Sequence, residues 1–192
     1  MIPRKLSPLD KNGLIQHFKN DIVGDDRRLR FGMPASDGII EAYINDSFKE
    51  YGYKNIWFVV EDKFRIVATC HVAMDRETGT AELGCTVSPD YRNQKIGQEL
   101  FYRGVTWAAM AGANHVFMHC LSENRAIQHI AKKGGMTVVT IDPSEKESVI
   151  EVKQNRFEAG FQDLIMDQIA IYDCAIRGQN FFTNKFLRGF IK

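Results

Sequence analysis

The chain has 192 residues, of which 44% are hydrophobic and 26% are charged, and its 25 basic and 24 acidic side chains nearly cancel. The length fits a single globular domain, and the charge balance gives no electrostatic argument for binding nucleic acid or an anionic membrane. The N-terminus lacks the apolar core of a signal peptide, and no stretch approaches the ~20 apolar residues of a membrane span. We therefore expect a cytoplasmic protein.

The four cysteines are far apart in the sequence and form no CxxC pair. Each lies in an apolar run, which is typical of a buried reduced thiol rather than of a metal ligand. We therefore expect no metal site and reduced thiols at Cys70, Cys85, Cys120 and Cys174.

The first 50 residues predict a short strand followed by two helices. Residues 2–6 fit a strand, and Ser7 followed by Pro8 is typical of a helix start. Ser36 is the expected N-cap of a second helix, whose apolar side chains recur at helical spacing. The segment 25–32 between these helices is charged and compact.

The middle of the chain predicts a mixed α/β sheet. Asp62-Lys63 separates two β-rich runs, which indicates a hairpin, and a third strand follows over 80–87. A β-helix-β unit then predicts that the strands on either side of helix 96–111 are parallel and adjacent, in a sheet of about six to seven strands. The remaining expected elements are strands over 55–61, 65–74, 115–121, 136–141 and 148–153, and a helix over 123–133.

The C-terminal residues predict a long helix followed by a short aromatic and basic tail. The helix has one apolar face, made of Phe157, Phe161, Ile165, Ile169, Tyr172 and Ile176. The tail contains Phe181, Phe182, Phe186 and Phe190. We expect residues 1–154 to form the main domain and residues 155–192 a helical extension that packs on it or on the partner in a homodimer.

The turn between strand 80–87 and helix 96–111 has the properties of a phosphate site. A helix N-terminus exposes unpaired N–H groups and a partial positive charge, and Arg92 and Lys95 add cationic side chains there. Gly97 is expected to let the backbone approach a bulky anion. Many helices begin in this way without binding a ligand, so the turn alone does not distinguish a phosphate site from an ordinary helix start.

Two linked motifs make the sequence similar to the GNAT superfamily of N-acetyltransferases. The first is Arg92-Asn93-Gln94-Lys95-Ile96-Gly97 after a strand that ends at Val87, which resembles the family's Gln/Arg-x-x-Gly-x-Gly/Ala motif. The second begins at Asn124 and ends at Gly134-Gly135-Met136. The resemblance implies a GNAT fold and transfer of the acetyl group of acetyl-CoA to an amine.

The resemblance also implies which residues bind acetyl-CoA. The amides of 93–98 would hold the pyrophosphate, the backbone at Thr86 and Val87 would pair with the pantetheine arm, and Asn124 would hydrogen-bond to the same arm. The strands that end at Val87 and Leu121 would splay apart to admit it. The full expected set is Thr86, Val87, Arg92, Asn93, Gln94, Lys95, Ile96, Gly97, Gln98 and Asn124.

Four positions depart from the family pattern. Lys95 stands where the first glycine of the motif is usual, Met136 replaces a phenylalanine, and Gly134 replaces an apolar residue that closes the helix. Ala131 occupies the position where many relatives carry a tyrosine that serves as general acid. The missing tyrosine and the Ala81-Glu82 pair resemble the members that acetylate protein lysines.

Glu82 is the expected general base, since an ammonium acceptor must lose a proton before it attacks a thioester. The residue lies in an apolar strand, where burial would raise the pKa of its carboxyl. The alternative is a side chain on the solvent face. His71, on the preceding strand, is a second candidate base, although a structural role is favoured for it. His119 and Ser122 are weaker candidates, and Glu123 is expected to interact with a helix N-terminus.

The acceptor is left open between a protein lysine or α-amine and a small amine, with protein favoured. Arg27, Arg28 and Arg30 are expected either to receive an acidic acceptor or to belong to a surface loop held by Asp25 and Asp26. The alternative function is a non-catalytic module of the same fold that binds or senses acyl-CoA.

Overall fold

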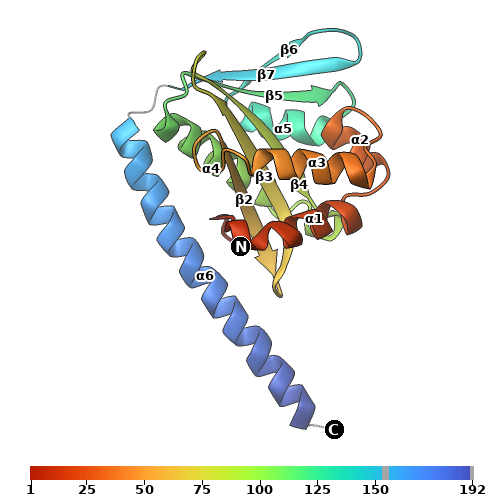
Figure 1. Ribbon diagram of the computed structural model, residues 1–192, viewed down its shortest axis with the longest axis vertical. Helices are drawn as coiled ribbons and strands as arrows, with labels where there is room; N and C mark the ends of the chain where they lie inside the picture. The colour runs from red at the N-terminus through yellow and green to blue at the C-terminus, as the bar shows by residue number, and fades with distance from the viewer. Residues whose placement is uncertain (153–155, 191–192) are drawn as a thin grey trace.

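The computed structural model describes residues 1–152 and 156–190; the side chains of residues 156, 157, 174 and 177–190 are outside the description. Within it, seven strands form one sheet in the order β1-β2-β3-β4-β5-β7-β6 (Figure 1). β4 and β5 are parallel, and the other neighbouring pairs are antiparallel. The strands are β1 (Arg4–Lys5), β2 (Asn55–Asp62), β3 (Arg65–Asp75), β4 (Thr80–Val87), β5 (His115–Leu121), β6 (Thr137–Thr140) and β7 (Glu145–Glu151).

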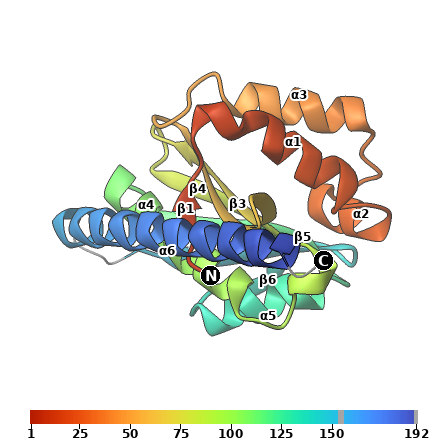
Figure 2. The same ribbon diagram turned by 90° about the horizontal axis from the view of Figure 1, so that it is seen from below.

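Helices cover both sides of this sheet (Figure 2). On one side, which we call the N-terminal face, lie α1 (Lys11–Asn20), α2 (Asp25–Phe31) and α3 (Asp37–Ser47). On the opposite side lie α4 (Ile96–Ala111), α5 (Arg125–Lys133) and α6 (Arg156–Phe190). The predicted mixed α/β sheet is therefore confirmed, as is the parallel pairing of the strands that flank α4.

Helix starts follow the capping residues of the sequence. The Ser7 side chain accepts a hydrogen bond from the Leu9 amide and forms a capping box with Asp10, which opens a short 3₁₀ turn before α1. The Ser36 side chain accepts from the Ile39 amide and caps α3. The segment 25–32 is the helix α2 rather than a loop, and it ends at Gly32 in the left-handed conformation.

The alternation of side chains along β2 divides the core into two parts. Ile56, Phe58 and Val60 belong to the cluster against α4, whereas Trp57 and Val59 belong to the cluster against α1 and α3. A strand buried on both faces in this way has no solvent side. Burying both faces of the central strands fixes the helices on each side and so positions the turn between β4 and α4.

Most predicted boundaries agree with the structure to within a few residues, and β4, α4 and β5 agree at both ends. Among the strands the largest difference is β7, which begins at Glu145 instead of residue 148 because it pairs along the whole of β5, with His115 opposite Glu151 and Leu121 opposite Glu145. Cys70, Cys85 and Cys120 are buried free thiols, as expected, while the side chain of Cys174 lies outside the description.

α6 packs on the domain through a face different from its apolar one. Among the side chains of α6 that the structure describes, the buried ones are Ala159, Asp163 and Ala170. Asp163 pairs with Arg103 of α4 at 2.8 Å, and both side chains are at most 3% exposed. Arg103 and Lys5 each also pair with Asp167. The contact with α4 therefore depends on a buried ion-pair cluster as well as on small residues.

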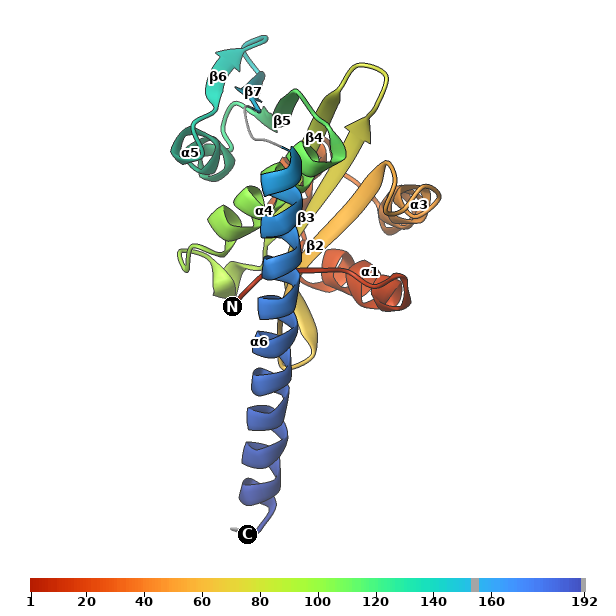
Figure 3. The same cartoon turned by 90° about the vertical axis from the view of Figure 1, so that its left-hand side faces the viewer.

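The predicted apolar face of α6 is exposed to solvent, at Phe161, Ile165, Ile169, Tyr172 and Ile176. The helix continues through the predicted tail to Phe190 and extends well beyond the sheet (Figure 3). The side chains of Phe157 and of the tail lie outside the description. None of the helices described is long and apolar enough to cross a membrane.

Candidate active site

The strands β4 and β5 separate along the sheet, as the resemblance to the GNAT superfamily implied. Their paired residues run only from Thr80 opposite His115 to Glu82 opposite Phe117. Beyond Glu82, β4 continues to Val87 with β3 as its one neighbour, and Thr86 pairs with Thr69. The backbone edge of β4 that faces β5 is therefore open to another extended chain over residues 83–87.

The turn after β4 presents a run of open amides. No acceptor within the described residues receives a hydrogen bond from the backbone N–H of residues 93–97. Asn93 and Lys95 both have positive φ angles, 61° and 63°, an arrangement that turns successive amides toward a common point. The run is shorter than predicted by one residue, because the amide of Gln98 donates to the carbonyl oxygen of Lys95 at 2.9 Å. Five consecutive free N–H groups at a helix N-terminus suit a pyrophosphate.

Two side chains of this turn differ from expectation. Arg92 is paired with Asp26 at 2.7 Å and donates to the Val87 carbonyl, so its charge is already partly balanced. A Cβ atom on Gly97 would meet Cδ1 of Ile130 at 2.7 Å. The absent side chain of Gly97 thus makes room for α5, not for an anion. Lys95 takes the left-handed conformation itself, without the freedom of glycine.

Asn124 and Ala131 place α5 beside the open edge. The Asn124 side chain caps α5 by accepting from the Ile127 amide, and its Nδ2 donates to the carbonyl oxygen of Leu29 in α2. Asn124 therefore links α2 to α5 next to the gap between β4 and β5. Ala131 is fully buried in α5, so no hydroxyl is available at this position.

Glu82 lies at the last paired position between β4 and β5, on the N-terminal face of the sheet. Ala81 and Leu83 on either side belong to the core against α4. The Glu82 side chain is exposed, although both neighbouring strands pair with the residue. The expected burial is therefore wrong: the strand is internal, but α1, α2 and α3 leave this point of it uncovered. The exposed carboxylate thus lies at the start of the unpaired edge of β4, which we call the opening between β4 and β5.

His71 has a structural role and is not placed to act as the general base. It lies opposite Gly84 in the sheet, and its ring stacks on Trp57 with a centroid distance of 4.4 Å. The Tyr43 hydroxyl is 2.7 Å from Nδ1, and Nε2 is 3.0 Å from Oδ1 of Asn55. Since the Asn55 oxygen can only accept, Nε2 carries the proton and Nδ1 accepts from Tyr43. Burial, with a further contribution from Arg30, lowers the pKa of His71 to about 3.

The remaining candidates from the sequence are engaged elsewhere. Glu123 pairs with Arg28 at 2.5 Å instead of with a helix end, and Ser122 donates to the Pro143 carbonyl. His119 is exposed and lies 3.4 Å from Glu147. Arg27 clamps the end of α1 by donating to the carbonyl oxygens of Phe18, Lys19, Ile22 and Ala35.

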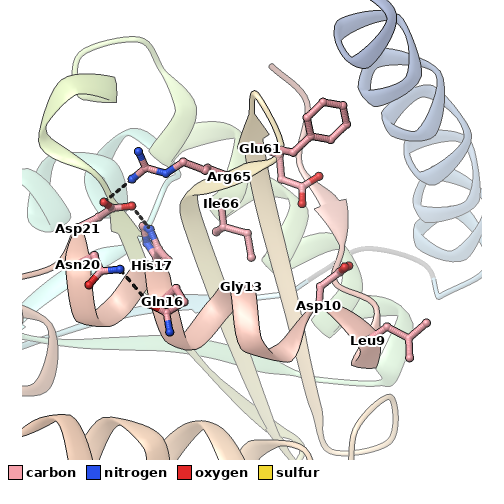
Figure 4. Close-up of a pocket in the computed structure, with 11 residues that line it drawn as sticks. Leu9, Asp10, Gly13, Gln16, His17, Asn20, Asp21, Glu61, Arg65 and Ile66 are labelled. Atoms are coloured by element: carbon pink, nitrogen blue, oxygen red, sulfur yellow. Dashed lines mark hydrogen bonds and ion pairs between the residues drawn. The ribbon is translucent and has the colours of Figure 1, made fainter. Parts of the chain in front are cut away.

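A cavity of about 280 Å³ lies apart from this opening, between α1 and the β2–β3 hairpin (Figure 4). Its buried His17 is 3.4 Å from Asp21, which also binds Arg65. On its other side, His17 is 3.2 Å from the Thr86 hydroxyl of β4. Burial lowers the pKa of His17, so the ring is neutral at physiological pH. None of the predicted acetyl-CoA or catalytic residues lines this cavity.

Comparison with known families agrees with this geometry. The family model described as an acetyltransferase (GNAT) domain matches residues 3–137, which include β4, the open amides and α5. The chain therefore belongs to the GNAT family of acetyltransferases and is an acetyl-CoA-dependent N-acetyltransferase. No curated protein matches the sequence.

Solved structures share the fold at low sequence identity. The GNAT domain of S. lividans PAT has a TM-score of 0.68 at 12% identity, over 78% of this chain and 89% of that one. A ribosomal-protein-alanine N-acetyltransferase from Brucella melitensis has a TM-score of 0.63 at 12% identity, over 79% and 100%. A spermidine N-acetyltransferase from Vibrio cholerae, in complex with CoA and spermine, has a TM-score of 0.61 at 16% identity, over 78% and 94%.

Proposed function

We propose that this enzyme acetylates a primary amine by direct attack on the thioester, with Glu82 as the general base. The observation that carries the proposal is the place of Glu82, an exposed carboxylate at the last residue where β4 pairs with β5. The free amides of residues 93–97 are proposed to hold the pyrophosphate of acetyl-CoA. The pantetheine arm then lies along the edge of β4 and passes this carboxylate.

The reaction needs two contributions from the chain, a general base and a hydrogen-bond donor. Acetyl-CoA supplies an activated acetyl group. Glu82 accepts a proton from the ammonium form of the acceptor, so that the nitrogen lone pair is free to attack the thioester carbonyl carbon. The C–N bond forms and the C–S bond breaks, and the second proton of the amine passes to the departing thiolate, which leaves as free CoA. An N–H of the open β4 edge, between Leu83 and Val87, donates to the carbonyl oxygen as charge develops there.

For the acceptor, we propose a protein amine or a small amine reached from the N-terminal face. The absence of a tyrosine at Ala131 resembles the members that acetylate protein lysines, which favours a protein acceptor. The relatives named above include one acting on a ribosomal protein's alanine and one acting on spermidine. Both classes therefore belong in the acceptor panel.

We also propose that the extension 155–192 joins two copies of the enzyme. Ile165, Ile169, Tyr172 and Ile176 are exposed and follow one another at intervals of four, three and four residues. This spacing is that of a coiled-coil seam, so the stripe suits the same stripe of a second copy. Ile169→Glu should turn a dimer into a monomer in sedimentation velocity.

The function is tested by measuring acetyl-CoA binding and acetyl transfer separately. Calorimetry should detect acetyl-CoA binding to wild type and to Glu82→Gln alike, while only wild type transfers acetyl to a panel of amines and lysine peptides. Glu77→Gln, an exposed glutamate in the β3–β4 turn, is the matched control and should keep full activity. A wild type that binds acetyl-CoA but acetylates nothing would favour a non-catalytic acyl-CoA sensor.

A further inference from the structure

Arg30 is held beside the exposed carboxylate of Glu82 by a chain of contacts. Its Nη2 donates to the Tyr43 hydroxyl at 2.8 Å, and that hydroxyl donates in turn to His71. The guanidinium also lies 5.2 Å from the ring centroid of Phe31. On its other side it packs against the backbone of Gly84, where a Cβ atom would come within 2.6 Å of Cζ.

This guanidinium has little of its hydrogen-bonding capacity used. It has five N–H groups, and one of them donates a hydrogen bond within the described residues. Its Nε is buried and has no partner there. No carboxylate oxygen of those residues lies within 4.0 Å of it. A guanidinium matches a carboxylate by two parallel hydrogen bonds, so the unused donors are suited to a carboxylate from outside the chain.

The neighbouring arginines show that this state is particular to Arg30. Arg28, two residues before Arg30 in α2, is paired with both Asp25 and Glu123. Arg27 is paired with Asp37 at 2.8 Å. The three arginines of α2 therefore have different roles, and Arg30 alone among them forms no ion pair with the described residues.

The distance between Glu82 and Gly84 indicates how far apart the ammonium and the carboxylate of a matching ligand lie. Residues two apart in a strand lie on the same face and are separated by roughly 7 Å. Arg30 covers Gly84 and interacts electrostatically with Glu82, so a positive and a negative group lie on the same face of β4, two residues apart. An acceptor that carries an ammonium and a carboxylate a few bonds apart complements both.

We propose that Arg30 binds a carboxylate of the acceptor, so that the substrate of this enzyme is an amine with a carboxylate close to it. This rests on the proposed function of Glu82. The carboxylate belongs either to a small amino acid or to an acidic group next to the amine of a peptide. Tyr43 and His71 are positioning residues that fix the guanidinium in place.

The test is the preference of the full-length enzyme among matched acceptors with acetyl-CoA. Amino acids are compared with their amides, and lysine peptides with a neighbouring glutamate are compared with the glutamine peptides. Wild type should prefer the acid of one pair by roughly ten- to a hundredfold in kcat/KM. Arg30→Gln should reduce that ratio to near one, Arg30→Lys should restore part of it, and Arg28→Gln should leave it unchanged.

The pair that shows the preference identifies the source of the carboxylate. Equal turnover of acid and amide by wild type, or an unchanged ratio in Arg30→Gln, would overturn the proposal. So would a preference for succinyl-CoA over acetyl-CoA that depends on Arg30 without any preference among acceptors. Acetyl-CoA binding by Arg30→Gln, measured by calorimetry, shows that the variant is folded. Bound acetyl-CoA with no turnover of any acceptor would instead overturn the proposed function.

Discussion

The guanidinium of Arg30 occupies the space that a side chain on Gly84 would need. Gly84→Ala should therefore displace Arg30, raise KM for the acceptor and lower the free energy of unfolding by about 1–3 kcal/mol, since extra volume is forced into a filled site. Acetyl-CoA affinity should not change. Gly13→Ala in α1 is the control, because its Cβ would meet Ile66 at an ordinary 3.6 Å. If KM for the acceptor is the same in Gly84→Ala as in wild type, Arg30 does not bind the acceptor.

Lys95 allows backbone strain and charge to be tested separately. Its φ of 63° favours glycine, so Lys95→Gly should be more stable to urea than Lys95→Ala by about 1 kcal/mol. If the ammonium contacts a phosphate, both variants should bind acetyl-CoA a few-fold more weakly, and the loss should shrink as salt is added. If both variants bind acetyl-CoA as tightly as wild type, the backbone amides hold the phosphate without the Lys95 ammonium.

The ion pair between Arg103 and Asp163 is predicted to hold α6 on the domain. Asp163→Asn leaves a buried guanidinium less well compensated, so the free energy of unfolding should fall by up to about 3–5 kcal/mol. Limited proteolysis should then cut within α6 before it cuts the domain. Glu158→Gln, an exposed change in the same helix, is the control. A proteolysis pattern like that of wild type would mean that the pair does not hold α6.

Because His71 is buried and neutral in the folded protein, we expect the protein to lose stability in mild acid. The pKa of His71 is about 3 in the folded protein because of burial, whereas an unfolded histidine has a pKa near 6.5. Below pH 6.5 the unfolded chain binds a proton that the folded chain does not, so stability present above that pH is lost as the pH falls. Urea unfolding should show that His71 accounts for about 2 kcal/mol of the loss between pH 8 and pH 5.

The comparison variant for this measurement is His71→Gln. It should be less stable at pH 8, since Tyr43 and Asn55 lose their partner, but its unfolding free energy should fall less steeply toward pH 5. Equal slopes for wild type and variant would show that His71 becomes protonated in the folded state.

The sequence predicted the features that depend on residues close together in the chain. The open amides of residues 93–97 follow from a strand, a turn and a helix start that are contiguous in the chain, and the predicted bounds of that strand and that helix agree with the structure. The exposure of Glu82 could not be predicted, because it depends on where α1, α2 and α3 leave the sheet uncovered. Periodicity also identified an apolar face of α6 but not its buried face, which is selected by Arg103 sixty residues earlier.

Arg30 was one of three equivalent arginines in the sequence. Its distinct role arises from Tyr43 and Gly84, which come from a different helix and from a strand. One local signal was available: glycine inside an otherwise apolar strand indicates the close approach of another group. Gly84 is such a glycine.

The pH–rate profile of Glu82→Gln decides whether Glu82 is the general base. If Glu82 removes the proton from the acceptor, kcat/KM of the variant should fall by roughly 10²- to 10⁴-fold at neutral pH. The deficit should shrink as the pH rises and the amine loses its proton to solvent, while acetyl-CoA affinity stays at the wild-type value. A variant with wild-type kcat/KM at neutral pH would contradict the account, as would a deficit of the same size at every pH.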